Sequence, residues 1–213
     1  PTVTSLRIRL HRVARLLATT LAPRLAADPM APLYLLEIAG GPSADGLNAL
    51  LLLEQQGLLA SRTVRLVVYD IDAAGPAFAA NMLAAPKAGP LAGRDIALDH
   101  ISGSWSDPVA LKGVLAGIPA GAVLAATSEG GLFEYGSDAD IRAVLEALAP
   151  RAALVAGSVT RADELNRLLR RHSRARTVPR GLERYTALIA GTGWQLEQSR
   201  PGPLSDQVLL TRS

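Results

Sequence analysis

The stretch LLEIAGGPSADG, residues 35–46, passes from an apolar run into small residues and a proline. The apolar run 33–39 is typical of a buried strand, and the run 44–59 after the small residues is typical of a helix. A glycine turn between a strand and a helix lets the backbone approach a ligand closely, because glycine has no Cβ. The stretch therefore predicts a binding turn at the carboxyl end of a first strand.

The turn departs from the G-x-G-x-x-G fingerprint of dinucleotide-binding proteins. With Gly41 as the middle glycine, Ala39 and Ala44 occupy the other two glycine positions. Pro42 removes a backbone N–H where a pyrophosphate needs a donor, and Asp45 adds negative charge at the helix start, where it repels phosphate. No G-K-[ST] follows, so the P-loop motif is absent as well. We expect this turn to bind a ligand without phosphates.

Strand-type and helix-type runs alternate along the rest of the chain, which is typical of a parallel sheet with helices on both faces. The strand candidates are residues 33–39, 64–70, 94–101, 122–128, 152–158, 194–199 and 207–212. RPGPLSD joins the last two runs and is short enough for an antiparallel hairpin. The prediction is an α/β fold with a three-layer, Rossmann-like, seven-stranded mixed sheet that ends in an antiparallel hairpin.

An amphipathic helix is expected before the first strand. Leucine and valine recur at helical spacing between residues 6 and 21, while Arg7, His11, Arg12 and Arg15 fall on the other side. We interpret residues 1–32 as a helical extension and residues 33–213 as the main domain. The extension is expected to pack through its apolar stripe, in a position to cap a pocket at the carboxyl ends of the strands.

The composition fits one globular domain. The 213 residues are 49% hydrophobic and 19% charged, which is enough to bury one core. The absence of cysteine excludes disulfides, thiolate metal sites and cysteine nucleophiles, and it agrees with a reducing cytoplasm, where we expect the protein. Apolar stretches are interrupted well before the ~18 residues of a membrane span. The net charge of +3 is weak evidence for an anionic partner.

The stretch resembles the first motif of the class I S-adenosylmethionine-dependent methyltransferases. That motif is an apolar strand ending in an acid, then G-x-G-x-G, often with proline after the second glycine. Glu37, Gly41 and Pro42 match it, whereas Ala39 and Ser43 replace the first and third glycines. The resemblance implies S-adenosylmethionine as the cofactor. The residues it assigns to the methionine end of the cofactor are Glu37, Ala39, Gly40 and Gly41.

The resemblance extends over residues 33–212. The family's second strand ends in an acid that accepts hydrogen bonds from the ribose hydroxyls, and VVYDID supplies Asp70, with Asp72 close behind. We favour Asp70 because it directly ends the apolar run, and we assign Ile71 beside it to the cofactor site. After the third strand, where the family surrounds the adenine, the chain offers Ser104 and Trp105. Simple packing is the alternative role for the indole.

After the fourth strand, where family members position the methyl acceptor, the chain has TSEGGLFEYGSD. An Asn or Asp followed by Pro-Pro and an aromatic residue, common in methyltransferases that act on the amino groups of nucleic-acid bases, is missing there. Ser128 is assigned to the cofactor, and Glu129 and Tyr135 are the candidate catalytic residues that hold or deprotonate an acceptor. A surface or turn-stabilising role is the alternative for both.

Other polar residues near this edge are given structural roles. His100 is interpreted as a structural histidine, with general base for a hydroxyl acceptor as the alternative. Metal-dependent methylation needs an acidic cluster at the end of the fourth strand, whereas Asp138 and Asp140 lie beyond it and are interpreted as caps of the helix 138–148. No metal site is predicted.

Eight arginines lie between Arg161 and Arg184, a density that can neutralise phosphates. Few aromatic residues interleave with them, and Leu165, Leu168 and Leu169 are typical of an ordinary amphipathic helix with an arginine-rich outer face. We therefore predict methyl transfer from S-adenosylmethionine to a small-molecule acceptor. The alternatives are an RNA methyltransferase that uses the arginines, a nucleotide-binding oxidoreductase and a non-catalytic cofactor-binding module.

Overall fold

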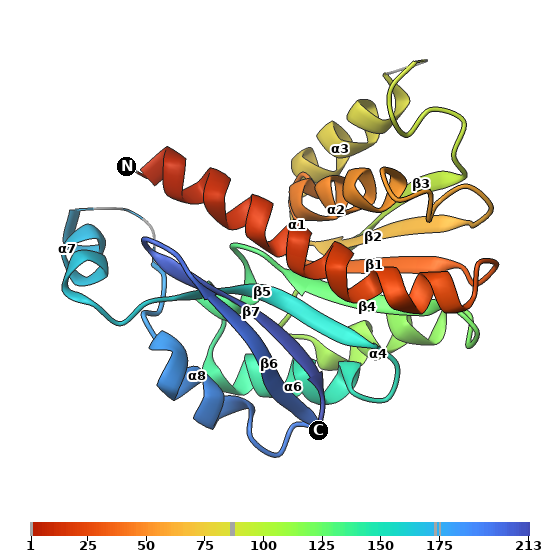
Figure 1. Cartoon of the computed structure of the whole chain (residues 1–213). Helices are drawn as coiled ribbons and strands as arrows, with labels where there is room; N and C mark the ends of the chain where they lie inside the picture. The colour runs from red at the N-terminus through yellow and green to blue at the C-terminus, as the bar shows by residue number, and fades with distance from the viewer. Residues whose placement is uncertain (1, 86–87, 173, 175) are drawn as a thin grey trace.

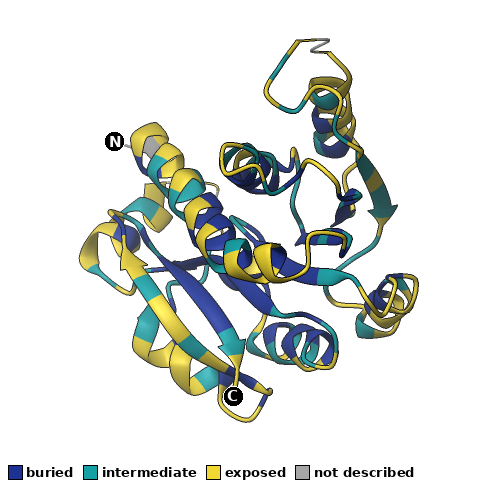
Figure 2. Ribbon diagram, turned by 45° about the vertical axis from the view of Figure 1, so that its right-hand side comes forward, coloured by how far each residue is buried: buried dark blue, intermediate teal, exposed yellow. Residues whose placement is uncertain are grey.

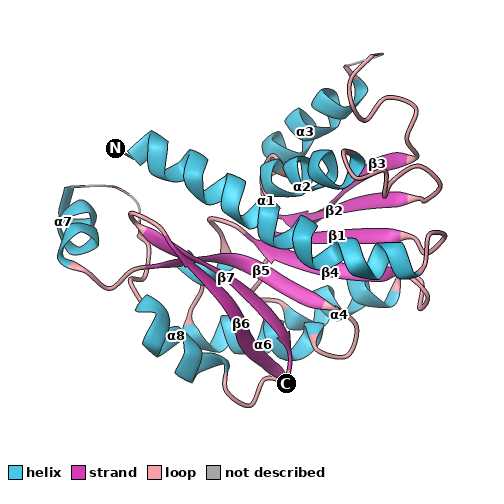
Figure 3. Cartoon of the chain, in the orientation of Figure 1, coloured by secondary structure: helices cyan, strands magenta, loops and turns pink. Residues whose placement is uncertain are grey.

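A computed structural model describes residues 2–85, 88–172, 174 and 176–213, and it has one sheet between two layers of helices (Figures 1 and 3). The strands are β1 Leu33–Ile38, β2 Val64–Asp70, β3 Ile96–Ser102, β4 Val123–Ser128, β5 Leu154–Thr160, β6 Trp194–Pro201 and β7 Ser205–Arg212. The helices are α1 Thr2–Ala27, α2 Ala44–Glu54, α3 Ala74–Ala84, α4 Pro108–Ala116, α5 Leu132–Tyr135, α6 Asp138–Leu148, α7 Glu164–His172 and α8 Gly181–Ile189.

The predicted seven-stranded mixed sheet is confirmed. Its strand order is β3-β2-β1-β4-β5-β7-β6. The neighbouring strands from β3 to β5 pair in parallel, whereas β7 is antiparallel to both β5 and β6. The chain order reverses direction between β1 and β4, so the crevice at the carboxyl ends of these two strands is where an open α/β sheet binds ligands.

Each face of the sheet has its own core. One core is formed with α1 and α2 and the other with α4, α6 and α8. Figure 2 shows the inner strands in dark blue, as buried, and the outward sides of the helices in yellow, as exposed. In β1 both Leu35 and Leu36 are fully buried, because the strand is covered on both faces. That double burial explains the continuous apolar run in the sequence.

Helix α1 packs on the sheet as its apolar stripe predicts. It crosses the face of the sheet beside α2 (Figure 1), and Val13, Leu17 and Leu21 are fully buried there. Arg7 and Arg15 on the other side are exposed. Because α1 shares a core with α2 and the strands, it is a layer of the fold; a separate unit over residues 1–32 stays a prediction. No helix within the described ranges has the length and hydropathy needed to cross a membrane.

The arginine-rich segment differs from the prediction. In α7 the side chains of Leu165 and Leu168 are about half exposed, at 48% and 49%, so the expected packing of these leucines is wrong. Arg180 is buried instead of facing solvent, and it donates to the carbonyl oxygens of Phe133, at 3.0 Å, and Gly136. The arginines of this segment therefore do not form one continuous surface.

The start of α6 also differs in part. Ser137 is the N-cap and forms a reciprocal capping box with Asp140, which confirms the capping role of Asp140. Asp138 makes ion pairs with Arg180, at 2.8 Å, and with Arg184, at 2.7 Å. Asp138 is therefore an anchor for the segment before α8 and not a cap of its own helix.

Candidate functional site

The turn after β1 has the backbone conformation of a glycine motif even at positions where glycine is replaced. The backbone is left-handed at Ala39 (φ 54°), Gly41 (φ 48°) and Ser43 (φ 54°). These are the three glycine positions of G-x-G-x-G. A left-handed conformation costs a residue with a Cβ roughly 1–2 kcal/mol, so the surrounding structure imposes it on Ala39 and Ser43.

Glu37 lies directly beneath this turn and is fully buried. Ser43 Oγ donates to Glu37 Oε1 at 2.5 Å, while Glu37 Oε2 has no hydrogen-bond partner among the described residues. A Cβ on Gly40 would lie 2.5 Å from Glu37 Cβ, and one on Gly46 would overlap Oε1, so both glycines leave room for the carboxyl group. Burial raises the pKa of Glu37 well above its usual value, and the nearby Asp45 raises it further.

Asp45 is a second buried carboxyl group at the same place. It lies in the first turn of α2 and accepts a hydrogen bond from Thr127 Oγ1 of β4 at 2.6 Å. Burial raises its pKa, although this hydrogen bond opposes the rise. Two buried carboxyl groups under one turn favour a ligand that carries positive charge, because a cation stabilises their ionised forms.

Asp70 ends β2 and ties the two predicted motifs together. Its carboxylate accepts from the backbone N–H of Gly41 at 3.0 Å and from that of Asp72 at 2.9 Å. Asp72 is exposed and accepts from Ala74 N at the start of α3. Asp70 is therefore the acid that faces the turn. Ile71 is 74% exposed beside it, an apolar side chain left in contact with solvent at the site.

The loop after β3 is fixed by Tyr69 of β2. The Tyr69 hydroxyl donates to Ser104 O at 3.0 Å, and Gly103 leaves no room for a Cβ against the Tyr69 ring. Ser104 Oγ accepts from a backbone N–H two residues later. Trp105 is half-buried against the core below α4. His100 Nε2 lies 3.0 Å from Asp70 O, so the histidine joins β3 to the end of β2.

Ser128 joins the ends of β1 and β4. Its buried hydroxyl donates to Ile38 O at 3.0 Å and accepts from Leu132 N at 2.7 Å. A Cβ on Gly131 would lie 2.8 Å from Ala39 Cβ, so the turn after β4 lies against the glycine turn. Ser128 thus positions both turns, and its contact with a cofactor stays a prediction.

Arg9 of α1 and Glu134 of α5 lie at this edge, and the sequence patterns singled out neither. Arg9 Nε contacts Glu129, and Arg9 Nη1 donates to Glu134 Oε2 at 2.8 Å. The side chain passes over Gly130, where a Cβ would lie 2.8 Å from Arg9 Nη2. Helical periodicity is the signal that was missed. Arg9 stands four residues before Val13, so the two side chains share the apolar face of the helix and Arg9 is directed toward the sheet.

The two glutamates that meet Arg9 have shifted pKa values. Burial raises the pKa of Glu129 to about 8, although Arg9 acts in the opposite direction. Burial also raises the pKa of Glu134, against the effect of Arg9 and of a hydrogen bond from Thr160. Perturbed carboxyl groups at a ligand crevice are typical of functional sites. Tyr135, the other candidate acceptor-holding residue, follows Glu134 directly and is 41% exposed.

Two hollows lie near these elements, at opposite ends of the strands. A hollow of about 240 Å³ is lined by Arg9, Glu134, Tyr135 and Thr160, the last residue of β5. A larger one of about 350 Å³ lies between α2, α3 and the segment before β3, and Ile96 at the amino end of β3 lines it. Of these two, the first lies at the carboxyl ends of the strands.

Solved structures share the fold over most of the chain. Magnesium protoporphyrin IX methyltransferase from Synechocystis PCC 6803, with bound S-adenosylhomocysteine, has a TM-score of 0.62 at 13% identity, over 99% of this chain and 86% of that one. An S-adenosylmethionine-dependent methyltransferase from Methanosarcina mazei has a TM-score of 0.60 at 11% identity, over 85% and 92% of the two chains. The chain has the class I methyltransferase fold.

An O-methyltransferase from neocarzinostatin biosynthesis matches this methyltransferase fold with a TM-score of 0.55 at 18% identity, over 84% of this chain. The chain spans about half of that protein, 49% of its length. No protein-family model and no curated protein sequence matches the chain. At these identities the likeness shows the methyltransferase fold, and the chemistry of the site depends on its own residues.

Proposed function

We propose that the chain binds S-adenosylmethionine on the turn after β1 and transfers its methyl group to a small-molecule acceptor. The observation that carries the proposal is the left-handed backbone at Ala39, Gly41 and Ser43, above the buried Glu37 and in register with Asp70. Support also comes from the similar structures, of which one contains S-adenosylhomocysteine and another contains S-adenosylmethionine with a naphthoic acid. A cytoplasmic location stays a prediction from composition.

The residues at the turn fit this cofactor. Glu37 Oε2 is buried with no hydrogen-bond partner in the part of the chain that the structure describes, and Asp45 lies nearby, which suits the cationic methionine end of the cofactor. The carboxylate of Asp70 is held toward the turn by Gly41 N and is only half-buried, so it has lone pairs left for the ribose hydroxyls. Ile71 offers an exposed apolar surface for the adenine, with Ser104 and Trp105 on the next loop.

When bound, S-adenosylmethionine supplies a methyl group on a positively charged sulfur. The acceptor's lone pair forms the new bond to the methyl carbon, and the sulfur keeps the electron pair of the broken C–S bond. The protein's contribution is then mainly to orient the acceptor and to exclude water. We assign that task to Glu129, which directly follows β4, and to Tyr135, the last residue of α5. With a pKa of about 8, Glu129 carries a proton at neutral pH and holds an acceptor as a hydrogen-bond donor; above pH 8 it can take the acceptor's proton.

A pair of glycine substitutions tests the binding site. Gly40→Ala places a methyl group against Glu37, whereas Gly113→Ala on α4 meets no atom within 4 Å. We expect S-adenosylhomocysteine to raise the melting temperature of the wild type and of Gly113→Ala by mass action, and to leave that of Gly40→Ala unchanged. Circular dichroism verifies that both variants fold. Equal stabilisation of the two variants would contradict binding at this turn.

A further inference from the structure

The hollow of about 240 Å³ has walls from six separate segments. Leu6 and Arg9 come from α1, Tyr135 from α5 and Thr160 from the end of β5. Helix α7, Thr177 before α8 and the β6–β7 connection form the rest of the lining. Its apolar walls are the side chains of Leu6, Leu169 and Leu204. One or two rings, or an alkyl group of similar size, fit a hollow of this volume and lining.

The polar side chains at the floor of the hollow are Arg9, Glu134 and Thr160, and they bond to one another. Glu134 Oε1 accepts from Thr160 Oγ1 at 3.2 Å, and Glu134 Oε2 accepts from Arg9 at 2.8 Å. Arg9 also contacts Glu129, so its single positive charge faces two carboxyl groups. The floor therefore offers no net positive charge of its own to a ligand.

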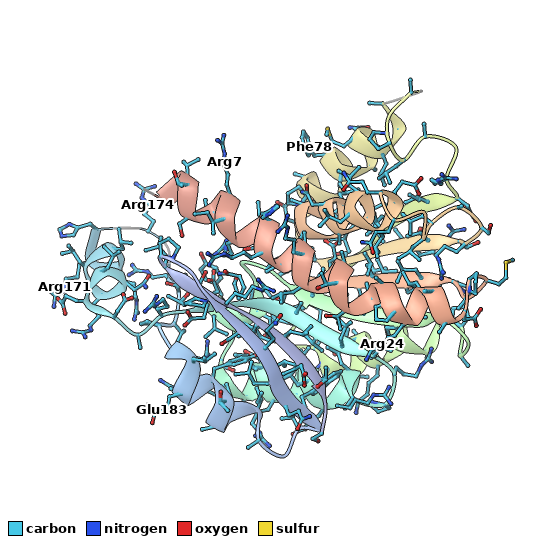
Figure 4. All side chains as sticks on the ribbon, in the orientation of Figure 1. Arg7, Arg24, Phe78, Arg171, Arg174 and Glu183 are labelled. Carbon is cyan, nitrogen blue, oxygen red and sulfur yellow. The ribbon has the colours of Figure 1, made fainter. Side chains whose placement is uncertain are left out.

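The mouth of the hollow is basic. Arg170 of α7 lines the hollow and is exposed, and Glu134 at the floor is the only acid among the lining residues that the structure describes. Other arginines close by on the sequence are matched, since Arg167 contacts Glu164 and Arg161 contacts Asp163. Figure 4 shows Arg7 on α1 and Arg171 and Arg174 by α7 at this same end of the molecule.

The hollow adjoins the cofactor turn through Arg9. The same guanidinium that reaches Glu134 at the floor passes over Gly130 in the turn after β4. The turn after β4 also lies against Ala39. A ligand in the hollow is thus one arginine side chain away from the residues that carry the glycine turn.

We propose that this hollow takes the methyl acceptor and that the acceptor is a small apolar acid, whose carboxylate or phosphate pairs with Arg170 at the mouth. The acceptor role rests on the proposed function, whereas the binding preference does not. The apolar body lies between Leu6, Leu169 and Leu204. A guanidinium favours a carboxylate or phosphate over a neutral group because it donates two parallel hydrogen bonds to them.

Three matched probes test the preference for an acid: indoleacetate, its neutral amide indoleacetamide and the cationic amine tryptamine. Calorimetric titration of the full chain, without cofactor and with saturating S-adenosylhomocysteine, is expected to show indoleacetate binding about tenfold more tightly than the amide, and tryptamine weakest. Equal or weaker binding of indoleacetate, or no binding of it at millimolar concentration, overturns the proposal.

Two variants on α7 locate the preference. Arg170→Gln is expected to remove the advantage of the acid over the amide, whereas Arg167→Gln, which lowers the net charge equally, is expected to keep it. Equal losses in both variants overturn the role of Arg170. Leu6→Trp fills the hollow from a side chain that is 40% exposed, so it should block all three indole probes and leave S-adenosylhomocysteine binding unchanged.

Binding of S-adenosylhomocysteine and binding of the indole probes can fail independently of each other. Failure of S-adenosylhomocysteine to bind contradicts the proposed function, while the titrations of the indole probes still report on the hollow. An RNA oligonucleotide that binds at physiological salt and displaces indoleacetate overturns the small acid in favour of a nucleic-acid acceptor.

Discussion

Arg9 Nη1 donates to Glu134 Oε2 at 2.8 Å across 125 positions of sequence, and this contact fastens the first helix to the acceptor side of the sheet. The same side chain contacts Glu129, so one guanidinium holds two carboxyl groups that are almost completely buried. The helix that precedes β1 is thereby part of the site.

Replacing Arg9 should destabilise the fold strongly. Arg9→Gln leaves the carboxyl group of Glu134 buried without its cation, and it removes the contact with the buried Glu129, so we expect the free energy of unfolding to fall by about 3 kcal/mol. Arg7→Gln, on the exposed side of the same helix, should change it by less than about 0.5 kcal/mol. Urea denaturation at neutral pH measures both. Similar small effects would mean that Arg9 is a surface residue in solution.

Stability should decrease as the pH rises through the neutral range. The pKa of Glu129 is about 8 in the folded protein against an ordinary value of 4.5, so the folded state binds more protons than the unfolded state between these values. The free energy of unfolding therefore falls with pH in this window, and Glu129→Gln should flatten the slope by up to about 1.4 kcal/mol per pH unit. Urea denaturation between pH 5 and pH 9 tests this. A slope unchanged by the substitution contradicts the raised pKa.

The backbone strain at Ala39 predicts a stabilising substitution. Ala39→Gly removes the Cβ from a left-handed residue and should raise the free energy of unfolding by about 0.5–1 kcal/mol, after the greater flexibility of glycine in the unfolded chain is subtracted. Ala143→Gly within α6 is the control and should lower it by about the same amount. If both glycines destabilise the protein equally, the turn is not left-handed at Ala39.

The two acids after β2 should differ in their effect on the cofactor. Asp70→Ala removes the carboxylate that holds Gly41 N and faces the turn, and we expect affinity for S-adenosylhomocysteine to fall by more than about tenfold. Asp72→Ala should have a much smaller effect because Asp72 is exposed and bonds to the start of α3. Titration calorimetry on both variants compares them, and the reverse order would move the second motif to Asp72.

The strands were predictable because strands buried on both faces leave continuous apolar runs. The run 64–70 coincides with β2, and the short connection before the last run forms the predicted hairpin. The contact of Arg9 was not predictable, since it joins segments far apart in sequence. Equally, nothing in a small residue such as Ser43 signals a left-handed backbone, which the surrounding fold imposes. Leu168 is half-exposed, which shows that helical spacing of leucines does not by itself predict that another part of the protein buries them.

Titration calorimetry of the wild-type chain with S-adenosylhomocysteine measures directly whether the turn after β1 binds this cofactor. We predict saturable binding of one ligand per chain, abolished by Gly40→Ala and retained by Gly113→Ala. Absence of binding at millimolar concentration, together with binding of NAD under the same conditions, would contradict it.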